Sequence, residues 1–284
     1  PRTPAIVSVM RKDMLTYQHI RRGKLITKCD QVVQKAIQFE HPMNEEIRIF
    51  LCLESLFSQL NTSIQQQQPH TSIITLLKII NVLDRPDIKT KICQRLNLYA
   101  TSLSQLKQFP SVDSNKLVNI LNQIDNLKAQ MHQQTSRLGE QLKRNEFLNQ
   151  LRQHLNFPGG LAYHNTFALT TWAHLPPAQQ LTDIIHWRKE LTSIESTIQL
   201  ILKLTRQTAA NQQQVASNGY FQKNLDTNLP IGLIIVRTQY HTYPEFSATR
   251  HRLNIRFMQP NYYDNAHPKQ TQEDIPFTLS CCQI

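Results

Sequence analysis

Arginines alternate with apolar residues in the segment TRHRLNIRFM, residues 249–258. If this segment is a β-strand, successive side chains point to opposite faces of a sheet. The residues of the two faces would be Leu253, Ile255 and Phe257 on one side, and Arg250, Arg252 and Arg256 on the other. The pattern therefore predicts a sheet with one apolar face and one face that carries a row of guanidinium groups.

Like charges along one sheet face repel each other unless something negative lies near them. No acidic residue lies between Arg250 and Met258. The neighbouring strands supply few acidic residues, and Glu273 and Asp274 are the nearest candidates in the sequence. Guanidinium groups bind carboxylate or phosphate through paired hydrogen bonds. An external anion or a carboxylate-bearing peptide is therefore one interpretation of this face. An ordinary solvated face of an antiparallel sheet is the other.

Other residues that could do chemistry do not form a recognisable site. The sequence contains no GxSxG, P-loop, GxGxxG or HExxH motif. His164, His174 and His186 lack a carboxylate partner at ligand spacing. For the adjacent Cys281 and Cys282 we expect one buried and one exposed thiol at a strand end, in preference to a metal or redox site. We therefore expect no enzyme activity, no metal and no cofactor.

The positive charge of the chain is concentrated near its start. The net charge is +11 over 284 residues, and residues 1–38 hold eight basic against two acidic residues. The remaining residues hold 23 basic and 18 acidic groups, so they are only mildly basic. No apolar run reaches the roughly 18 residues of a membrane span, and residues 1–38 lack the apolar core of a secretory signal. With five scattered cysteines, a reduced cytoplasmic compartment fits best.

Hydrophobic periodicity predicts helices followed by strands. Helices are expected over residues 42–60, 70–85, 86–109, 114–138, 144–156 and 180–208. We expect Pro42 in the first turn of the first helix. Strands are expected over residues 230–238, 250–258 and 274–282. Pro276 would make the last strand an edge strand, because proline cannot donate a ladder hydrogen bond.

This order of elements indicates the α+β class, a mainly helical bundle domain followed by a small antiparallel β-sheet domain. We expect residues 1–37 to form a basic extension, 38–210 the helical domain and 211–284 the β-strand domain. Residues 157–172 could join the β domain.

Seven separated blocks, in this order, resemble the ZapD family of bacterial cell-division proteins. The blocks are FEHPMNEEIRIFLCLE, LDRPDIKTKI, LRQHLNFPGG, TWAHLP, NGYFQ, RHRLNIRFM and FTLSCC. The resemblance covers about residues 38–282, and residues 1–37 lie outside it.

The resemblance implies a cytoplasmic homodimer with a helical domain and a β-strand domain. Proteins of this family bind the C-terminal tail of FtsZ, the tubulin-like division GTPase. They cross-link FtsZ filaments into bundles at the mid-cell division ring, and have no known catalytic activity or cofactor. The partners that the resemblance implies are therefore FtsZ and a second copy of the chain, with no membrane partner.

The resemblance also implies a positively charged tail-binding pocket. Its motif arginines fall here on Arg252 and Arg256, with Arg48 from NEEIRIF and Arg85 from LDRP. His154 stands where a basic residue follows LRQ, and Cys52 stands where relatives can carry arginine. The segment LKRNEF keeps a basic pair in a different register. Phe257 and Trp172 are expected to belong to the core, although Trp172 could line the groove. The complete set of expected tail-binding residues is Arg252, Arg256, Arg48, Arg85, Arg250, His154, Arg152 and Lys143.

Two alternatives remain. An enzyme of unknown type would require a deep pocket with coupled acid and base groups, and the sequence shows none. The other alternative is a basic helical nucleic-acid-binding protein. The basic extension and the arginine face favour it, but the body is only mildly basic and contains no recognised nucleic-acid motif. Deletion of residues 1–37 separates the two hypotheses, because nucleic-acid binding should collapse and tail binding should persist.

Overall fold

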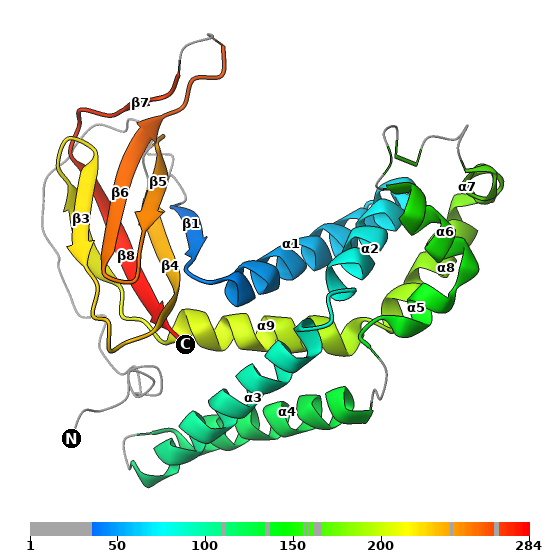
Figure 1. Cartoon of the computed structure of the whole chain (residues 1–284), viewed down its shortest axis with the longest axis horizontal. Helices are drawn as coiled ribbons and strands as arrows, with labels where there is room; N and C mark the ends of the chain where they lie inside the picture. Colours follow the sequence, from blue (N-terminus) through cyan, green and yellow to red (C-terminus); the bar gives the residue numbers. More distant parts are fainter. Residues whose placement is uncertain are drawn as a thin grey trace, which may run out of the picture. The chain divides into compact units, whose positions relative to one another are not determined.

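The computed structural model describes residues 36–284 except 110–111, 134–136, 156, 158–159, 162–165, 239–240 and 264–266. Residues 1–35 of the extension expected over 1–37 thus lie outside the described residues, and Ile37 begins a strand. The described chain divides into two compact units, one with the strands and one with most of the helices (Figure 1). Of the described residues, the strand unit contains those of 36–45, Phe109–Asp113 and Thr205–Ile284, and the helical unit contains those of Glu46–Gln108 and Ser114–Leu204. Helices followed by antiparallel sheets confirm the expected α+β class.

The strand unit consists of two antiparallel sheets (Figure 1). The first has the order β1 (Ile37–Pro42), β4 (Ile231–Thr238), β8 (Ile275–Gln283) and β2 (Gln212–Ala216). The second has the order β3 (Tyr220–Asn224), β6 (Arg252–Gln259) and β5 (Tyr243–Ala248), and the short β7 (Lys269–Gln270) also pairs with β6.

The two sheets share one apolar core. Leu253, Ile255 and Phe257 of β6 are fully buried in it, which confirms the alternation predicted for this strand. Phe277 of β8 packs against Phe257, with ring centroids 5.1 Å apart. Because the core fixes one face of β6, the opposite face of the strand must point away from it.

The three predicted strands are present, but the structure adds others. The predicted helix start at Pro42 is wrong, because Pro42 is the last residue of β1 and the first helix begins at Glu45. The predicted edge position of Pro276 is also wrong, because β8 lies between β4 and β2. Proline is tolerated there because the described pairing with β4 ends at Thr278, so Pro276 faces only Val215 of β2.

The helical unit contains helices at most of the predicted positions, together with two short helices, α5 (Glu140–Arg144) and α7 (Phe167–Ala173), that were not predicted. Its other α-helices are α1 (Glu45–Gln65), α2 (Pro69–Leu83), α3 (Ile88–Gln105), α4 (Ser114–Gln133), α6 (Glu146–Leu155), α8 (Pro177–Lys189) and α9 (Thr192–Gln207). Asn145 separates α5 from α6, and its side chain accepts a hydrogen bond from the Leu148 N–H, as an N-cap residue does. The helix α7 lies in the helical unit.

The single helix predicted over 180–208 is wrong, because the chain turns at Glu190 and Leu191 between α8 and α9. Arg188, before the turn, donates to the Glu195 carboxylate at 2.8 Å and to the Asn61 side chain at 2.7 Å. This contact with α1 stabilises a break that no glycine or proline marks in the sequence.

The two adjacent cysteines point to opposite faces of β8. Cys282 is fully buried, as expected for one of the pair, and burial raises the pKa of its thiol to about 12. Cys281 is half-buried, so it is less accessible than we expected. Neither of these two thiols forms a disulfide. Among the described residues, no helix combines the length and hydropathy that a membrane crossing requires.

We expect Phe277→Ala to destabilise the strand unit by about 3–5 kcal/mol, because it leaves a cavity between the sheets where Phe277 contacts Phe257 and Phe221. Phe167→Ala is the matched control, since Phe167 is 81% exposed and its removal should change stability by less than about 0.5 kcal/mol. Chemical denaturation followed by circular dichroism measures both. Equal effects would show that Phe277 is not part of a close-packed core.

Candidate peptide-binding surface

The outer face of β6 presents Arg252 and Arg256 to solvent. Both side chains are exposed, whereas the alternate residues of β6 are buried in the core. The strand register places Tyr220 of β3 and Glu245 of β5 on either side of Arg256, and Asn224 of β3 beside Arg252. Since a strand rises about 3.3 Å per residue, the two arginines lie roughly 13 Å apart along it.

Arg256 has a carboxylate neighbour that the sequence analysis missed. Its Nη2 lies 3.2 Å from Glu245 Oε2, and the two side chains are 57% and 42% exposed. Neither expected acidic neighbour takes this place. The Asp274 carboxylate instead accepts the backbone N–H of Asn218 at 2.8 Å, and Glu273 lies in the exposed segment before β8. The alternation of Tyr243, Glu245 and Ser247 with Pro244, Phe246 and Ala248 could have identified Glu245.

A hollow of about 430 Å³ lies beside this ion pair. It is lined by Tyr220, Glu245, Phe246, Ser247, Asn254 and Arg256. The Tyr220 hydroxyl is 3.0 Å from Gln222 Oε1 and 3.2 Å from Asn254 Oδ1. The hollow thus combines neutral hydrogen-bonding groups and the Phe246 side chain with one cation and one anion, so it can offer a ligand hydrogen bonds, apolar contact and a guanidinium group.

Arg250 does not belong to this face, contrary to the sequence prediction. It lies in the turn before β6, where its Nη2 is 3.4 Å from the Thr227 carbonyl oxygen. The Thr249 hydroxyl accepts the Arg252 backbone N–H at 3.1 Å and so stabilises the turn. Among the described residues, the Arg252 guanidinium has no ion-pair partner, so Arg252 is the most available cation of the predicted set.

The other predicted residues lie in the helical unit. Arg48 is exposed on α1. Arg85 is exposed in the turn after α2, with its Nε 3.6 Å from Asp87 Oδ1. His154, on α6, is half-buried with its ring 6.0 Å from that of Phe157. Trp172 is 8% exposed and its indole N–H donates to Asp183 at 2.9 Å, so it is chiefly a core residue.

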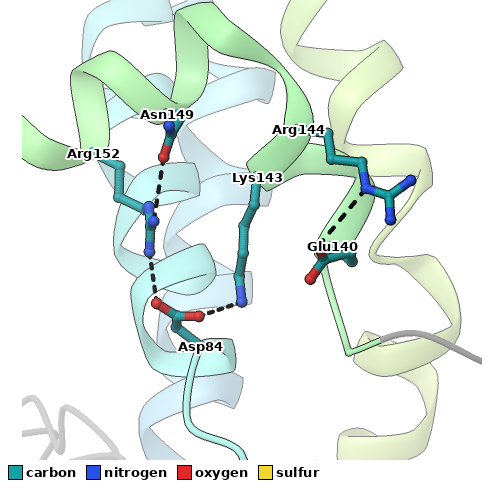
Figure 2. A network of polar contacts seen from close by, with 6 residues as sticks. All are labelled: Asp84, Glu140, Lys143, Arg144, Asn149 and Arg152. Atoms are coloured by element: carbon teal, nitrogen blue, oxygen red, sulfur yellow. Dashed lines mark hydrogen bonds and ion pairs between the residues drawn. The ribbon is translucent and has the colours of Figure 1, made fainter.

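Two predicted residues, Lys143 and Arg152, share the carboxylate of Asp84 (Figure 2). Lys143 Nζ binds one Asp84 oxygen, and Arg152 Nη1 lies 2.7 Å from the other. The hydrogen bond from Lys143, followed by that from Arg152, holds the pKa of Asp84 below its usual value against the opposing effect of burial. Arg152 also donates to Asn149 at 3.2 Å.

This shared carboxylate links α5 and α6 to the residue that follows α2 (Figure 2). Lys143 is only 11% exposed, so its charge is largely committed to Asp84. We therefore interpret Lys143 and Arg152 first as groups that hold the helices together. Among the described residues, no cluster of three or more His, Cys, Asp or Glu side chains could hold a metal ion.

Comparison with known proteins gives a consistent result. A family model described as ZapD, cell division protein, matches residues 51–256. A cell division protein ZapD of Coxiella burnetii (strain RSA 331 / Henzerling II) is 38% identical over 258 residues, which cover 89% of this chain and 100% of that protein. The cell division protein ZapD of Aliivibrio fischeri is 32% identical over 251 residues, which cover 86% of this chain and 97% of that protein. The cell division protein ZapD of Cupriavidus taiwanensis is 30% identical over 253 residues, which cover 87% of this chain and 100% of that protein.

The fold and the candidate site define an α+β protein with a cationic, partly hollowed sheet face. The matches, which extend over most of the chain, are more specific: the chain belongs to the ZapD family of cell division proteins.

We expect Asp84→Asn to lower the free energy of unfolding by about 1–2 kcal/mol, because it removes the counter-charge of the nearly buried Lys143. Asp125→Asn makes the same chemical change at an exposed position of α4 and should change stability by less than about 0.5 kcal/mol. Equal stability of the two variants would contradict the structural role of the Asp84 network. Urea denaturation at pH 7 measures the difference.

The same network predicts a pH dependence. The pKa of Asp84 is lower in the folded protein than in the unfolded chain. The ionised carboxylate therefore contributes fully to the free energy of unfolding above the unfolded pKa of about 3.9, and this contribution is lost as the pH falls through the folded pKa. Between pH 5 and pH 3 the wild type should therefore lose more stability than Asp84→Asn. A parallel decline of both proteins would contradict this assignment.

Proposed function

We propose that this protein is a non-enzymatic cell-division factor that binds the C-terminal tail of FtsZ on the outer face of β6. As a homodimer in the cytoplasm it would cross-link FtsZ filaments and so stabilise the division ring at mid-cell. Membership of the ZapD family supports the role in division. The observation that carries the site is the exposure of Arg252 and Arg256 on one face of β6, beside a hollow of about 430 Å³.

Exposed guanidinium groups suit a short tail that carries carboxylates. Each can form paired hydrogen bonds with a carboxylate, and the neutral side chains of Tyr220 and Asn254 offer hydrogen bonds to a peptide backbone. Exposed charge pairs contribute little individually, and a flexible tail loses conformational entropy when it binds. We therefore expect weak binding at a single site.

Dimerisation would convert weak sites into effective cross-links. Two sites on one particle face filaments that each display many tails, so the second binding event occurs at a high effective concentration. Bundling then requires no catalysis and no cofactor.

The residues of the helical unit are secondary candidates. Arg48 and Arg85 match arginines of the family motif, whereas His154 departs from it at a position where the family has another basic residue. We propose that these three residues contribute to tail binding less than Arg252 and Arg256. Lys143 and Arg152 are weaker candidates still, because Asp84 already neutralises part of their charge.

We expect Arg252→Ala/Arg256→Ala to bind a fluorescent FtsZ C-terminal peptide about five- to thirtyfold more weakly than the wild type, which corresponds to about 1–2 kcal/mol for two exposed charge pairs. The matched control is Lys107→Ala/Arg137→Ala, which removes the same net charge from exposed positions of the helical unit. Fluorescence anisotropy at low and physiological salt measures affinity, and circular dichroism confirms the fold.

Equal binding by the double variant and the wild type would make the β6 face an ordinary solvated surface and would move the search to Arg48 and Arg85. Absence of wild-type binding would contradict the proposed function. In that case, binding of nucleic acid that is lost on deletion of residues 1–37 would favour the alternative considered above.

A further inference from the structure

The Arg256 guanidinium already contacts a carboxylate, and that carboxylate belongs to the protein itself. Glu245 lies directly opposite Arg256 in the β5–β6 ladder, with a single close contact of 3.2 Å between Nη2 and Oε2. Both side chains are exposed, so a ligand carboxylate could approach the same guanidinium. We propose that Glu245 is an intramolecular competitor for the acidic peptide that docks on β6. This inference rests on the proposed function in that an acidic peptide docks on the outer face of β6.

The two arginines of the face are unequal in this respect. Arg252 has neutral neighbours, because Asn224 faces it on β3 and the turn residue Thr249 precedes it. Within the described chain its guanidinium has no carboxylate partner. An acidic group of the ligand should therefore bind Arg252 without competition and Arg256 only against Glu245.

The surface between the two arginines can receive an extended main chain. Asn254 lies between them on the same face, flanked by Gln222 of β3 and Ser247 of β5. These side chains are neutral and can donate and accept hydrogen bonds. Because the arginines are roughly 13 Å apart, they match carboxylates on residues four positions apart in an extended peptide.

Glu245 should lower the affinity for an acidic peptide whether or not it leaves Arg256. If the ligand displaces it, binding is weakened by the ion pair that must break. If both carboxylates share the guanidinium, which has five N–H donors, they repel each other at close range. In either case the neutral isostere should bind an acidic peptide more tightly. Since exposed ion pairs are weak, the expected gain is about two- to fivefold.

The test compares Glu245→Gln with Glu190→Gln, which makes the same charge change at the exposed turn between α8 and α9. Two labelled peptides serve as probes in low salt, the FtsZ C-terminal peptide and capped hexaglutamate, which has no FtsZ sequence. We expect Glu245→Gln to bind both probes about two- to fivefold more tightly than the wild type. Glu190→Gln should match the wild type.

A double-mutant cycle with Arg256→Ala distinguishes competition at Arg256 from general charge repulsion. In the Arg256→Ala background, the gain from Glu245→Gln should fall to less than half. A gain of the same size in both backgrounds would overturn the competitor role, because it would not pass through Arg256.

The two probes separate this inference from the proposed function. A tighter hexaglutamate complex without any binding of the FtsZ peptide would support the competitor and contradict FtsZ-tail binding. Binding of the FtsZ peptide that Glu245→Gln leaves unchanged would support the proposed function and overturn the competitor. Failure of every variant to bind either probe would overturn both.

Discussion

The burial of one face of β6 is the constraint on which the candidate site depends. Leu253, Ile255 and Phe257 are locked in the core shared by the two sheets, and a shift of one residue would move them into water. The hydrophobic effect therefore fixes the register, and the register in turn fixes which polar side chains lie together on the outer face. Arg252 and Arg256 are presented to solvent by the packing of the residues between them.

Basic residues of the same chain serve different purposes because their surroundings differ. Lys143 and Arg152 share Asp84 in a partly buried network, where removal of the carboxylate would leave a nearly buried charge unpaired. Arg256 has an exposed partner, and an exposed pair can exchange its partner at little cost. Burial therefore separates cations that hold the helices together from cations that remain available to a ligand.

The fold was predictable where the pattern is local. The strands β4, β6 and β8 show a buried run or a clear alternation, and all three were predicted from it. The strand β2 was not predicted, because its QQQVA sequence has no apolar alternation. The strand β5 was not predicted either, although polar and apolar residues alternate over Tyr243–Ala248. The break between α8 and α9 was also missed, because the hydrophobic periodicity continues through Glu190 and Leu191. That turn depends on a contact with Asn61, which lies 127 residues from Arg188 in the sequence.

The site was predictable to a similar extent. The outward orientation of Arg252 and Arg256 follows from alternation alone, whereas the place of Arg250 in the turn depends on where the strand begins. The pairing of Lys143 and Arg152 with Asp84 joins residues 59 and 68 positions apart, which local spacing does not reveal. Glu245 is different, since it lies only 11 residues from Arg256 in a hairpin whose register could have been drawn from the sequence.

The most direct test of the account is a map of backbone amide chemical shifts as the FtsZ C-terminal peptide is added to the full-length protein. The account predicts that the largest changes occur in β3, β5 and β6, centred on Arg252, Asn254 and Arg256. Changes confined to the helical unit, with the amides of β6 unaffected, would contradict it.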